Sequence, residues 1–234
     1  MSMLSLYDLR QGFVHLFYPG LCEGCRKPFV AGEQVLCIGC AGQLPETAYH
    51  TMPGNETELR FAGRVPFVWA TSYAWFTTDG LLQHLLHGLK YRYRSDIGTY
   101  LGQRFAADLV TAGRSNDIDL IVPVPLHPSK QAARGYNQSM VIAAALGGDM
   151  AIEVSDTVLR RVRHTESQTT KTRQERAENM AGAFSVPDPS VISGKHILIL
   201  DDVLTTGATI EACAQTLLAA ADVRISIATI GIAV

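Results

Sequence analysis

The chain has 234 residues, of which 47% are hydrophobic and 18% are charged, and its formal net charge at pH 7 is −2. This length accommodates one hydrophobic core of about 150 residues together with a small additional module. A net charge so close to zero excludes a general electrostatic attraction to nucleic acid or anionic lipid, so such contacts would need local basic patches. Asp8 and Arg10 interrupt the N-terminal apolar stretch, and no apolar run approaches the ~18 residues of a membrane span, so we expect a cytoplasmic protein without membrane insertion.

Four of the five cysteines lie near the N-terminus as two Cys-x2-Cys pairs, at Cys22, Cys25, Cys37 and Cys40. Two such pairs at hairpin-length separation predict a structural zinc site with four thiolate ligands. Two disulfides or a redox-active pair are the alternatives. Disulfides are rare in chains without a secretion signal, and a redox pair would not need a second copy. We therefore expect a zinc-ribbon-like module over residues 1–50.

Residues 51–64 are predicted to be a linker, because positions 53–58 are all polar residues, glycine or proline. Residues 65–234 then alternate between strand and helix patterns. Strands are expected at 65–76, 120–124, 198–200 and 225–232, and helices at 81–89, 97–110, 140–146 and 210–221. This alternation predicts an α/β domain with a parallel sheet flanked by helices.

The segment Ile197–Thr209 reads I-L-I-L-D-D-V-L-T-T-G-A-T. Its apolar run predicts a buried strand, and Asp201 and Asp202 follow where ligands gather in parallel sheets. A turn precedes the next predicted helix and consists of Thr205, Thr206, Gly207, Ala208 and Thr209. The amides of a helix start favour an anion, and paired carboxylates accept from ribose hydroxyls or hold a divalent cation. The segment thus predicts a site for a phosphorylated pentose. The alternative is a strand followed by an ordinary capped helix.

Three other segments carry clustered cations. Lys130 and Arg134 follow a proline-rich turn, which would present them to a diphosphate unless the segment is simply a solvent-exposed loop. Residues 159–184 are rich in arginine, and this segment is predicted to be a lid over a polyanion or a solvated loop. Lys90–Arg94 interleaves cations with tyrosines, which can stack on single-stranded bases, although an ordinary helix terminus is the favoured interpretation.

Residues 197–209 resemble the 5-phosphoribosyl 1-pyrophosphate (PRPP) signature of type I phosphoribosyltransferases. Five further stretches, together with the four-cysteine module, resemble the ComF family: L-K-Y at 89–91, V-P-V-P-L at 122–126, R-G-Y-N-Q at 134–138, T-x-x-Q at 165–168 and R-x-x-N at 176–179. The resemblance implies a type I phosphoribosyltransferase-like fold. It also implies that Thr205–Thr209 holds the ribose 5-phosphate and that Asp201 and Asp202 contact the ribose hydroxyls.

The reaction implied by this resemblance is the displacement of pyrophosphate from PRPP with Mg²⁺. Asp201, Asp202 and Arg173 are the expected catalytic residues, and Lys130 and Arg134 are expected to bind the substrate. No residue pattern identifies the acceptor. Because ComF-like proteins are associated with competence, the alternative is a non-catalytic DNA-uptake module that binds single-stranded DNA or a helicase-like partner.

Overall fold

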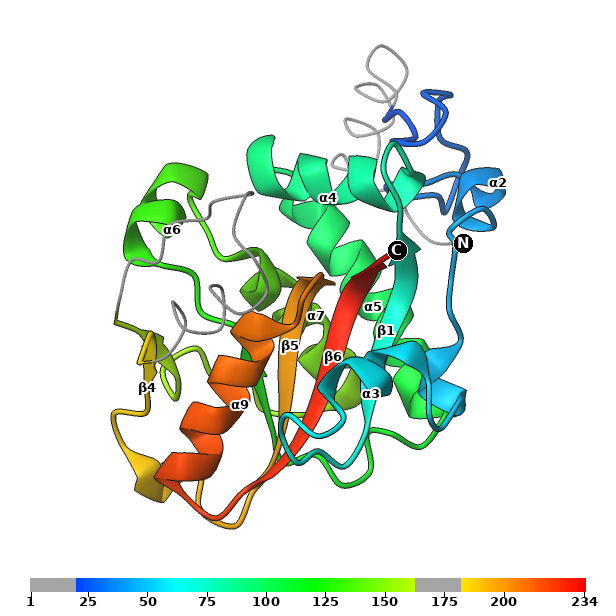
Figure 1. Ribbon diagram of the computed structural model, residues 1–234. Helices are drawn as coiled ribbons and strands as arrows, with labels where there is room; N and C mark the ends of the chain where they lie inside the picture. The colour runs from blue at the N-terminus through cyan, green and yellow to red at the C-terminus, as the bar shows by residue number, and fades with distance from the viewer. Residues whose placement is uncertain (1–19, 163–181) are drawn as a thin grey trace, which may run out of the picture. The chain divides into compact units, whose positions relative to one another are not determined.

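The computed structural model describes residues 20–162 and 182–234 of the chain (Figure 1). The chain divides into two compact units, Met1–Leu44 and Pro45–Val234. The smaller unit contains the four-cysteine segment and the larger one contains the predicted α/β domain. Among the helices in the described ranges, none combines the length and the apolar character that crossing a membrane requires.

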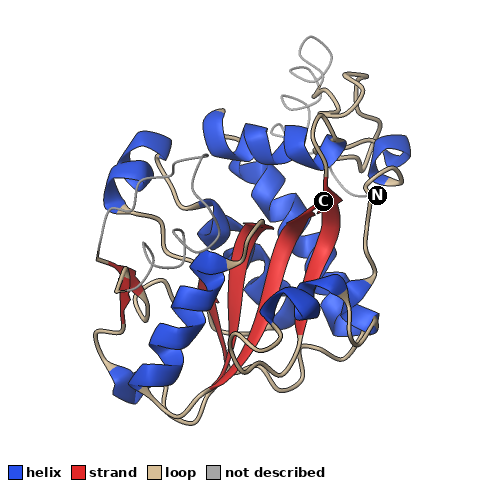
Figure 2. Cartoon of the chain, viewed as in Figure 1, coloured by secondary structure: helices blue, strands red, loops and turns tan. Residues whose placement is uncertain are grey.

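The larger unit is built on a four-stranded parallel sheet with the strand order β1-β6-β5-β2 (Figure 2). Its strands are β1 (Ala70–Phe76), β2 (Leu120–Pro123), β5 (His196–Leu204) and β6 (Arg224–Ala233). Residues 197–200 of β5 have no exposed surface, because the strand is central and both faces of the sheet are covered. The predicted parallel sheet is confirmed, although its first strand begins at Ala70 instead of residue 65.

Helices cover both faces of this sheet. Helices α5 (Ser95–Thr111) and α7 (Gln138–Met150) pack on one face, and α3 (Glu56–Phe61) and α9 (Ala208–Ala220) lie on the other (Figure 1). Helix α4 (Leu81–Tyr91) packs against α5 and β1. The larger unit also contains η1 (Tyr49–Thr51), α6 (Pro128–Arg134), β3 (Arg160–Arg161), β4 (Phe184–Ser185) and η2 (Pro189–Val191), and the smaller unit contains α2 (Ile38–Ala41).

The close packing of α5 on α7 depends on Gly102. A Cβ atom at this position would lie 2.6 Å from the carbonyl oxygen of Ile142, closer than carbon and oxygen can approach. The stripe that predicted this helix, Leu101, Phe105 and Leu109, is completely buried. Local periodicity therefore identified the helix, and the small residue beside the stripe brings it close to its neighbour.

The predicted linker at 51–64 is wrong, because this segment is part of the larger unit. It contains helix α3, whose Phe61 has no exposed surface. Asn55 caps the helix by accepting a hydrogen bond from Glu58 N, and its Nδ2 donates to Ala70 O at 2.9 Å. The polar residues that resemble a linker therefore cap the helix and anchor it to β1.

Candidate functional site

Asp201 and Asp202 lie within strand β5, three and two residues before its end at Leu204, whereas the sequence predicted a strand that stops at the acidic pair. Strand β5 stays in register with β6 up to Leu204, but β2 ends at Pro123, opposite Leu200. Strand β5 therefore extends beyond β2. The two carboxylates lie at the carboxyl edge of the sheet, which is where ligands bind in parallel α/β folds.

The environment of Asp201 favours its protonated form. Its Oδ1 accepts hydrogen bonds from Ser139 Oγ and from the Asp202 amide, both at 2.9 Å. Burial and the neighbouring charge of Asp202 nevertheless raise the pKa of Asp201 to about 7. Two carboxylates held this close together carry negative charge that a cation or a hydroxyl donor would stabilise.

Lys90 joins the acidic pair from helix α4. Its Nζ lies 2.7 Å from Asp202 Oδ2, and the two side chains are 22% and 16% exposed. Sequence patterns place Lys90 in the last turn of a helix, where a cation complements the dipole, and do not indicate this contact. The L-K-Y stretch is the signal that could have identified it as a site residue.

The loop after β5 begins helix α9, as predicted. Gly207 is the N-cap residue and adopts φ 78°, a left-handed conformation that suits glycine. The Ala208 amide faces Thr206 Oγ1 at 3.5 Å. Within the described ranges, the amides of Thr206 and Gly207 make no hydrogen bond to the protein. The loop Thr205–Thr209 thus brings together hydroxyls and amides at the start of a thirteen-residue helix, an arrangement that can hold an anion.

The proline-rich segment after β2 contains a helix, which the sequence did not predict. Pro128 opens α6, because a proline in the first turn lacks only an amide that has no helical partner. His127 caps the helix through Nδ1, which accepts from Ser129 N at 3.2 Å, and Gly135 ends it at φ 79°. The segment is rigid, as expected, but its cations lie on a helix and not on a turn.

Lys130 and Arg134 of α6 form a basic cluster with Arg161 of β3. Burial, and then the charges of Arg161 and Arg134, lower the pKa of Lys130. The Arg134 guanidinium also lies over the Tyr91 ring, 5.4 Å from its centroid, and donates to Gln138 at 2.9 Å. Cations that destabilise one another in this way favour an anionic ligand between them.

The basic cluster borders a pocket of about 240 Å³ between the end of α4 and α6. Its lining residues are Lys90, Tyr91, Tyr93, Lys130, Ala133 and Arg134. The two tyrosines are 59% and 69% exposed. Because Lys90 lies here and also contacts Asp202, the acidic pair, the basic cluster and the tyrosines are adjacent.

The R-G-Y-N-Q stretch mainly connects the elements around this site. The Tyr136 hydroxyl donates to the carbonyl of Leu89 in α4. Asn137 Nδ2 donates to Val124 O at 3.0 Å, and its Oδ1 caps α7 by accepting from Ser139 N. These bonds hold α4, the segment after β2 and the start of α7 together, so that Ser139 reaches Asp201.

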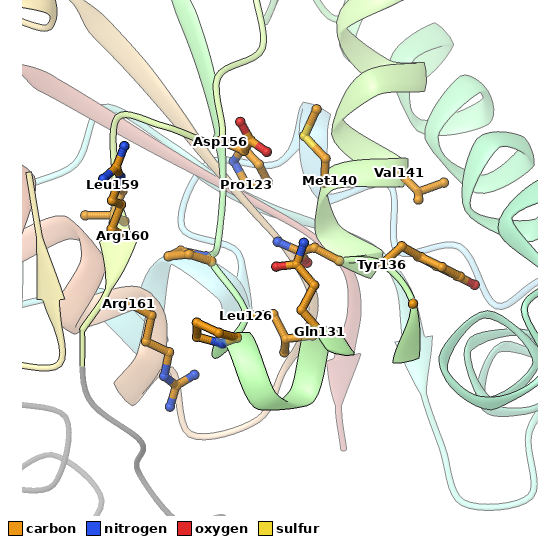
Figure 3. Close-up of a pocket in the computed structure, with 14 residues that line it drawn as sticks. Pro123, Leu126, Gln131, Tyr136, Met140, Val141, Asp156, Leu159, Arg160 and Arg161 are labelled. Carbon is orange, nitrogen blue, oxygen red and sulfur yellow. The ribbon is translucent and has the colours of Figure 1, made fainter. Parts of the chain in front are cut away.

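A second pocket, of about 390 Å³, opens beside the end of β2. Figure 3 shows it between α6, the start of α7 and strand β3. Its walls combine apolar and polar side chains. The apolar ones include Pro123, Leu126, Met140, Val141 and Leu159, and the polar ones include Gln131, Tyr136, Asp156, Arg160 and Arg161. The pocket adjoins the acidic pair, because Pro123 is paired with Leu200, the residue before Asp201.

The predicted lid, residues 159–184, begins and ends in a short antiparallel ladder. Arg160 pairs with Ser185 and Arg161 pairs with Phe184. Arg173, predicted to be catalytic, lies outside the described residues, as do the T-x-x-Q and R-x-x-N stretches. The two ends of the segment therefore lie side by side near the basic cluster.

Two arginines, Arg60 of α3 and Arg64 of the turn after it, also reach the Thr205–Thr209 loop, and the sequence did not indicate them. Arg60 donates to Thr205 O at 2.6 Å, and Arg64 donates to Thr206 O at 3.0 Å. Arg60 lines a further pocket beside the loop, of about 420 Å³, together with Thr205 and Thr206. The polar segment 51–64 offers no pattern from which this contact could be read.

In the smaller unit, the four predicted metal ligands come together. The Sγ atoms of Cys22, Cys25, Cys37 and Cys40 all lie within 4.8 Å of one another, and no disulfide joins them. Cys25 Sγ and Cys37 Sγ are 3.7 Å apart. A tetrahedral zinc site with Zn–S bonds of about 2.3 Å has sulfurs about 3.8 Å apart, so the cluster fits such a metal.

Amide groups point at one of these thiols. Gly24 N and Cys37 N donate to Cys22 Sγ at 3.3 and 3.2 Å. Burial opposes ionisation of Cys22, but amide donors lower its pKa to about 6. Burial and bonds to the neighbouring thiols raise the pKa of Cys40 to about 12. The cluster thus holds one stabilised thiolate, and a bound divalent cation would favour ionisation of the others.

Known proteins resemble this chain over a single domain and over most of its length. The family model of the phosphoribosyl transferase domain matches residues 132–234. The chain is 30% identical over 218 residues to DNA utilization protein YhgH of Escherichia coli strain K12, covering 87% of this chain and 92% of that protein. It is 26% identical over 223 residues to Competence protein F of Haemophilus influenzae, covering 92% and 93%.

A third relative is Competence protein ComFC of Bacillus subtilis strain 168, which is 24% identical over 198 residues and matches 80% of this chain and 79% of its own length. These relatives match between 80% and 92% of the chain, whereas the domain match covers residues 132–234, which contain β5 and its loop. The chain belongs to the ComF family of competence and DNA utilization proteins and carries a phosphoribosyl transferase domain.

Proposed function

We propose that the chain binds PRPP at the carboxyl end of β5 and transfers its phosphoribosyl group to an acceptor. The observation that carries this proposal is the adjacency of three chemically different groups: an amide- and hydroxyl-rich loop, an acidic pair and a basic cluster. Each suits a different part of one ligand, namely a phosphate monoester, a ribose diol and a diphosphate. The phosphoribosyl transferase domain match supports the same assignment.

In the proposed complex, the ribose 5-phosphate lies on Thr205–Thr209, where amides and hydroxyls donate to its oxygens. Asp201 and Asp202 accept hydrogen bonds from the ribose hydroxyls. Lys130 and Arg134 face the diphosphate, and Arg173 is proposed to join them. Lys90, already bound to Asp202, lies between the ribose and the diphosphate.

The residues present also fit Mg²⁺, which prefers oxygen ligands and is often shared between carboxylates and substrate phosphates. Asp201 and Asp202 would hold it together with oxygens of the ligand. Burial, and then the charge of Asp202, raise the pKa of Asp201, and a cation held between the two carboxylates would favour the ionised form of Asp201. When bound, Mg²⁺ would supply positive charge that stabilises the diphosphate as a leaving group.

The proposed reaction is a displacement at the anomeric carbon. The bond from that carbon to the diphosphate oxygen breaks, its electron pair leaves with pyrophosphate, and a bond to the acceptor forms. The residues Lys130 and Arg134 stabilise the negative charge that develops on the leaving group, and Asp201 and Asp202 face the positive charge that develops on the ribose ring. The described residues do not identify the acceptor.

Calorimetric titration of the metal-loaded protein with PRPP and Mg²⁺ tests this proposal, with Asp202→Ala as the control. We expect binding by the parent protein and its loss in the variant. Release of pyrophosphate in the presence of a panel of purines, pyrimidines and amines then tests transfer. A parent protein that does not bind PRPP would refute the proposed function.

A second candidate function is binding of single-stranded DNA. It is favoured by the exposed Tyr91 and Tyr93 beside Lys130 and Arg134, since exposed aromatics among cations stack on bases. The names of the relatives, DNA utilization and competence, agree with it. Binding of a labelled oligonucleotide that weakens steeply with salt, and that Tyr93→Ala reduces, would support it. Absence of binding at low salt would contradict it.

For the smaller unit we propose that the metal is Zn²⁺ and that its role is structural. Four thiolates in a tetrahedral arrangement are typical of structural zinc and leave no ligand position for a substrate. Metal analysis of the purified protein, expected to yield one zinc per chain, tests the assignment.

A further inference from the structure

Helix α3 and the turn that follows it place two arginine side chains, Arg60 and Arg64, on the outer side of the Thr205–Thr209 loop. Arg60 Nη1 donates to Thr205 O at 2.6 Å, and Arg64 Nη1 donates to Thr206 O at 3.0 Å. The two side chains are only 27% and 16% exposed. Two consecutive carbonyls of the loop are therefore held by one short segment that is remote in sequence, helix α3 and the turn after it.

The planarity of the peptide bond gives this contact a consequence on the other side of the loop. In a trans peptide the carbonyl and the following N–H point in opposite directions. The carbonyl of Thr205 shares its peptide with the amide of Thr206, and the carbonyl of Thr206 shares its peptide with the amide of Gly207. Holding both carbonyls toward α3 turns both N–H groups away from it. In the described part of the chain these two amides have no protein acceptor.

The packing of α3 on the loop depends on the same residues. A Cβ at Gly207 would lie 3.0 Å from a ring carbon of Phe61 and 3.3 Å from Arg64 Nη1. The guanidinium of Arg64 in turn lies over the Phe61 ring, 5.8 Å from its centroid. The glycine of the loop thus allows Phe61 and Arg64 to approach the backbone directly, and the positive φ of Gly207 directs the chain into α9.

Both arginines are neutralised by nearby glutamates, so their effect on the loop is one of position more than of charge. Arg60 Nη2 donates to Glu56 at 2.6 Å and to Ala233 O at 2.7 Å, which ties the end of β6 to the loop. Arg64 forms an ion pair with Glu211 in the first turn of α9. Each pair has no net charge, and the fork of each guanidinium is fixed by several partners.

We infer that Arg60 and Arg64 are positioning residues for the phosphate: they hold the carbonyls of Thr205 and Thr206 so that the amides of Thr206 and Gly207 face the ribose 5-phosphate. This inference rests on the proposed function, because it assigns the loop amides to that phosphate. A loop released from α3 can turn a carbonyl oxygen toward the anion, and the repulsion would weaken binding.

The test compares Arg60→Gln and Arg64→Gln with the parent protein. Arg114→Gln is the matched control, because Arg114 donates from Nε to a backbone carbonyl, His50 O, at 3.0 Å and lies over an aromatic ring, that of Trp69. Calorimetry with ribose 5-phosphate and with PRPP gives affinity and stoichiometry. Hydrogen exchange of the Glu211 amide, which donates to Gly207 O at 2.9 Å, reports on the order of the loop in the unliganded proteins, and thermal unfolding reports on stability.

We expect Arg60→Gln and Arg64→Gln to bind ribose 5-phosphate and PRPP at least about tenfold more weakly, with stoichiometry unchanged. The factor should be the same for both ligands, since both carry the 5-phosphate. Loop exchange should be faster, and Arg114→Gln should change neither quantity. Arg60→Lys retains the charge but not the fork, so it should remain weakened.

If the parent protein binds both ligands, three results would overturn the inference. These are unchanged affinity in both Arg60→Gln and Arg64→Gln, faster loop exchange without weaker binding, and full recovery of affinity in Arg60→Lys. If the parent protein binds neither ligand, the proposed function itself fails, and faster exchange in the variants would show that α3 orders the loop for another purpose.

Discussion

Lys90 Nζ lies 2.7 Å from Oδ2 of Asp202, so the last turn of α4 is joined by an ion pair to strand β5. Both side chains are mostly buried, at 22% and 16% exposure. A pair in this environment is worth more than one on the surface, because water screens it less. Lys90 also acts on the second carboxylate, since its charge lowers the pKa of Asp201 against the larger effect of burial.

Replacing Lys90 with methionine should therefore weaken PRPP binding at pH 7 by about tenfold or more, because it leaves Asp202 without its cation. The variant keeps the length of the side chain and removes its charge. Lys195→Met is the matched control, since Lys195 immediately precedes the opposite end of β5. Calorimetry measures both affinities. Equal affinities in Lys90→Met and Lys195→Met would contradict the role of Lys90.

Asp201→Asn should stabilise the protein near neutral pH when neither Mg²⁺ nor PRPP is present. The folded-state pKa of Asp201 is raised to about 7, so the folded protein binds more protons at this group than the unfolded chain does between about pH 4 and pH 7. The contribution of Asp201 to stability therefore falls as the pH rises through this window. Asparagine is never charged and can still accept from Ser139.

We expect Asp201→Asn to exceed the parent protein in unfolding free energy by about 1–3 kcal/mol at pH 8, and by less at pH 4. Urea unfolding across this pH range measures the difference. Stability curves that stay parallel would show that Asp201 does not titrate with a raised pKa. PRPP binding should be weakened in the same variant, because a carboxylate accepts ribose hydroxyls better than an amide does.

Gly207→Ala should affect both stability and binding. The φ of 78° is unfavourable for alanine, and its Cβ would press on Phe61 at 3.0 Å, so we expect a loss of about 1–2 kcal/mol. PRPP affinity should fall as the loop shifts. Gly148→Ala is the control, because Gly148 lies within α7 and a Cβ there meets nothing within 4 Å. In chemical unfolding, the free energy of unfolding of Gly148→Ala should equal or slightly exceed that of the parent protein. Equal losses in Gly148→Ala and Gly207→Ala would count against the special role of Gly207.

Cys22→Ser should release the metal of the smaller unit. The Cys22 thiolate accepts two amide hydrogen bonds, and few apolar residues of the described 20–44 segment are buried, so the fold there depends on the metal. Metal analysis should find the metal lost, and limited proteolysis should find faster cleavage within 20–44. Cys213→Ala, a change of a buried thiol in α9, should retain the metal. Full metal content in Cys22→Ser would contradict the assignment.

Much of the site was predictable because its central part is local in sequence. An apolar run, two aspartates, a threonine–glycine turn and a helix start follow one another directly, and each step depends on neighbouring residues alone. The four-cysteine spacing is local in the same sense. The structure has the predicted parallel sheet and the predicted helix start at α9, and the four thiols lie together as the spacing predicts.

The errors arose where local composition had another structural cause. The polar run at 51–64 resembled a linker, yet Asn55 and Glu58 cap a helix whose Phe61 is buried. Pro128 resembled a helix breaker, yet it opens α6. Composition does not distinguish a loop from a short capped helix, because capping residues and turn residues are the same types.

The sequence by itself determined the kinds of chemical group at the site, and only the tertiary structure decided which groups surround them. Nothing local links Lys90 to Asp202, or Arg60 and Arg64 to the carbonyls of the loop. Those contacts exist because α4 and α3 pack beside the carboxyl end of β5, and packing is settled by burial over the whole unit. The long, flexible side chains of lysine and arginine then reach the nearest carboxylate or carbonyl. Which group is nearest depends on where the elements meet.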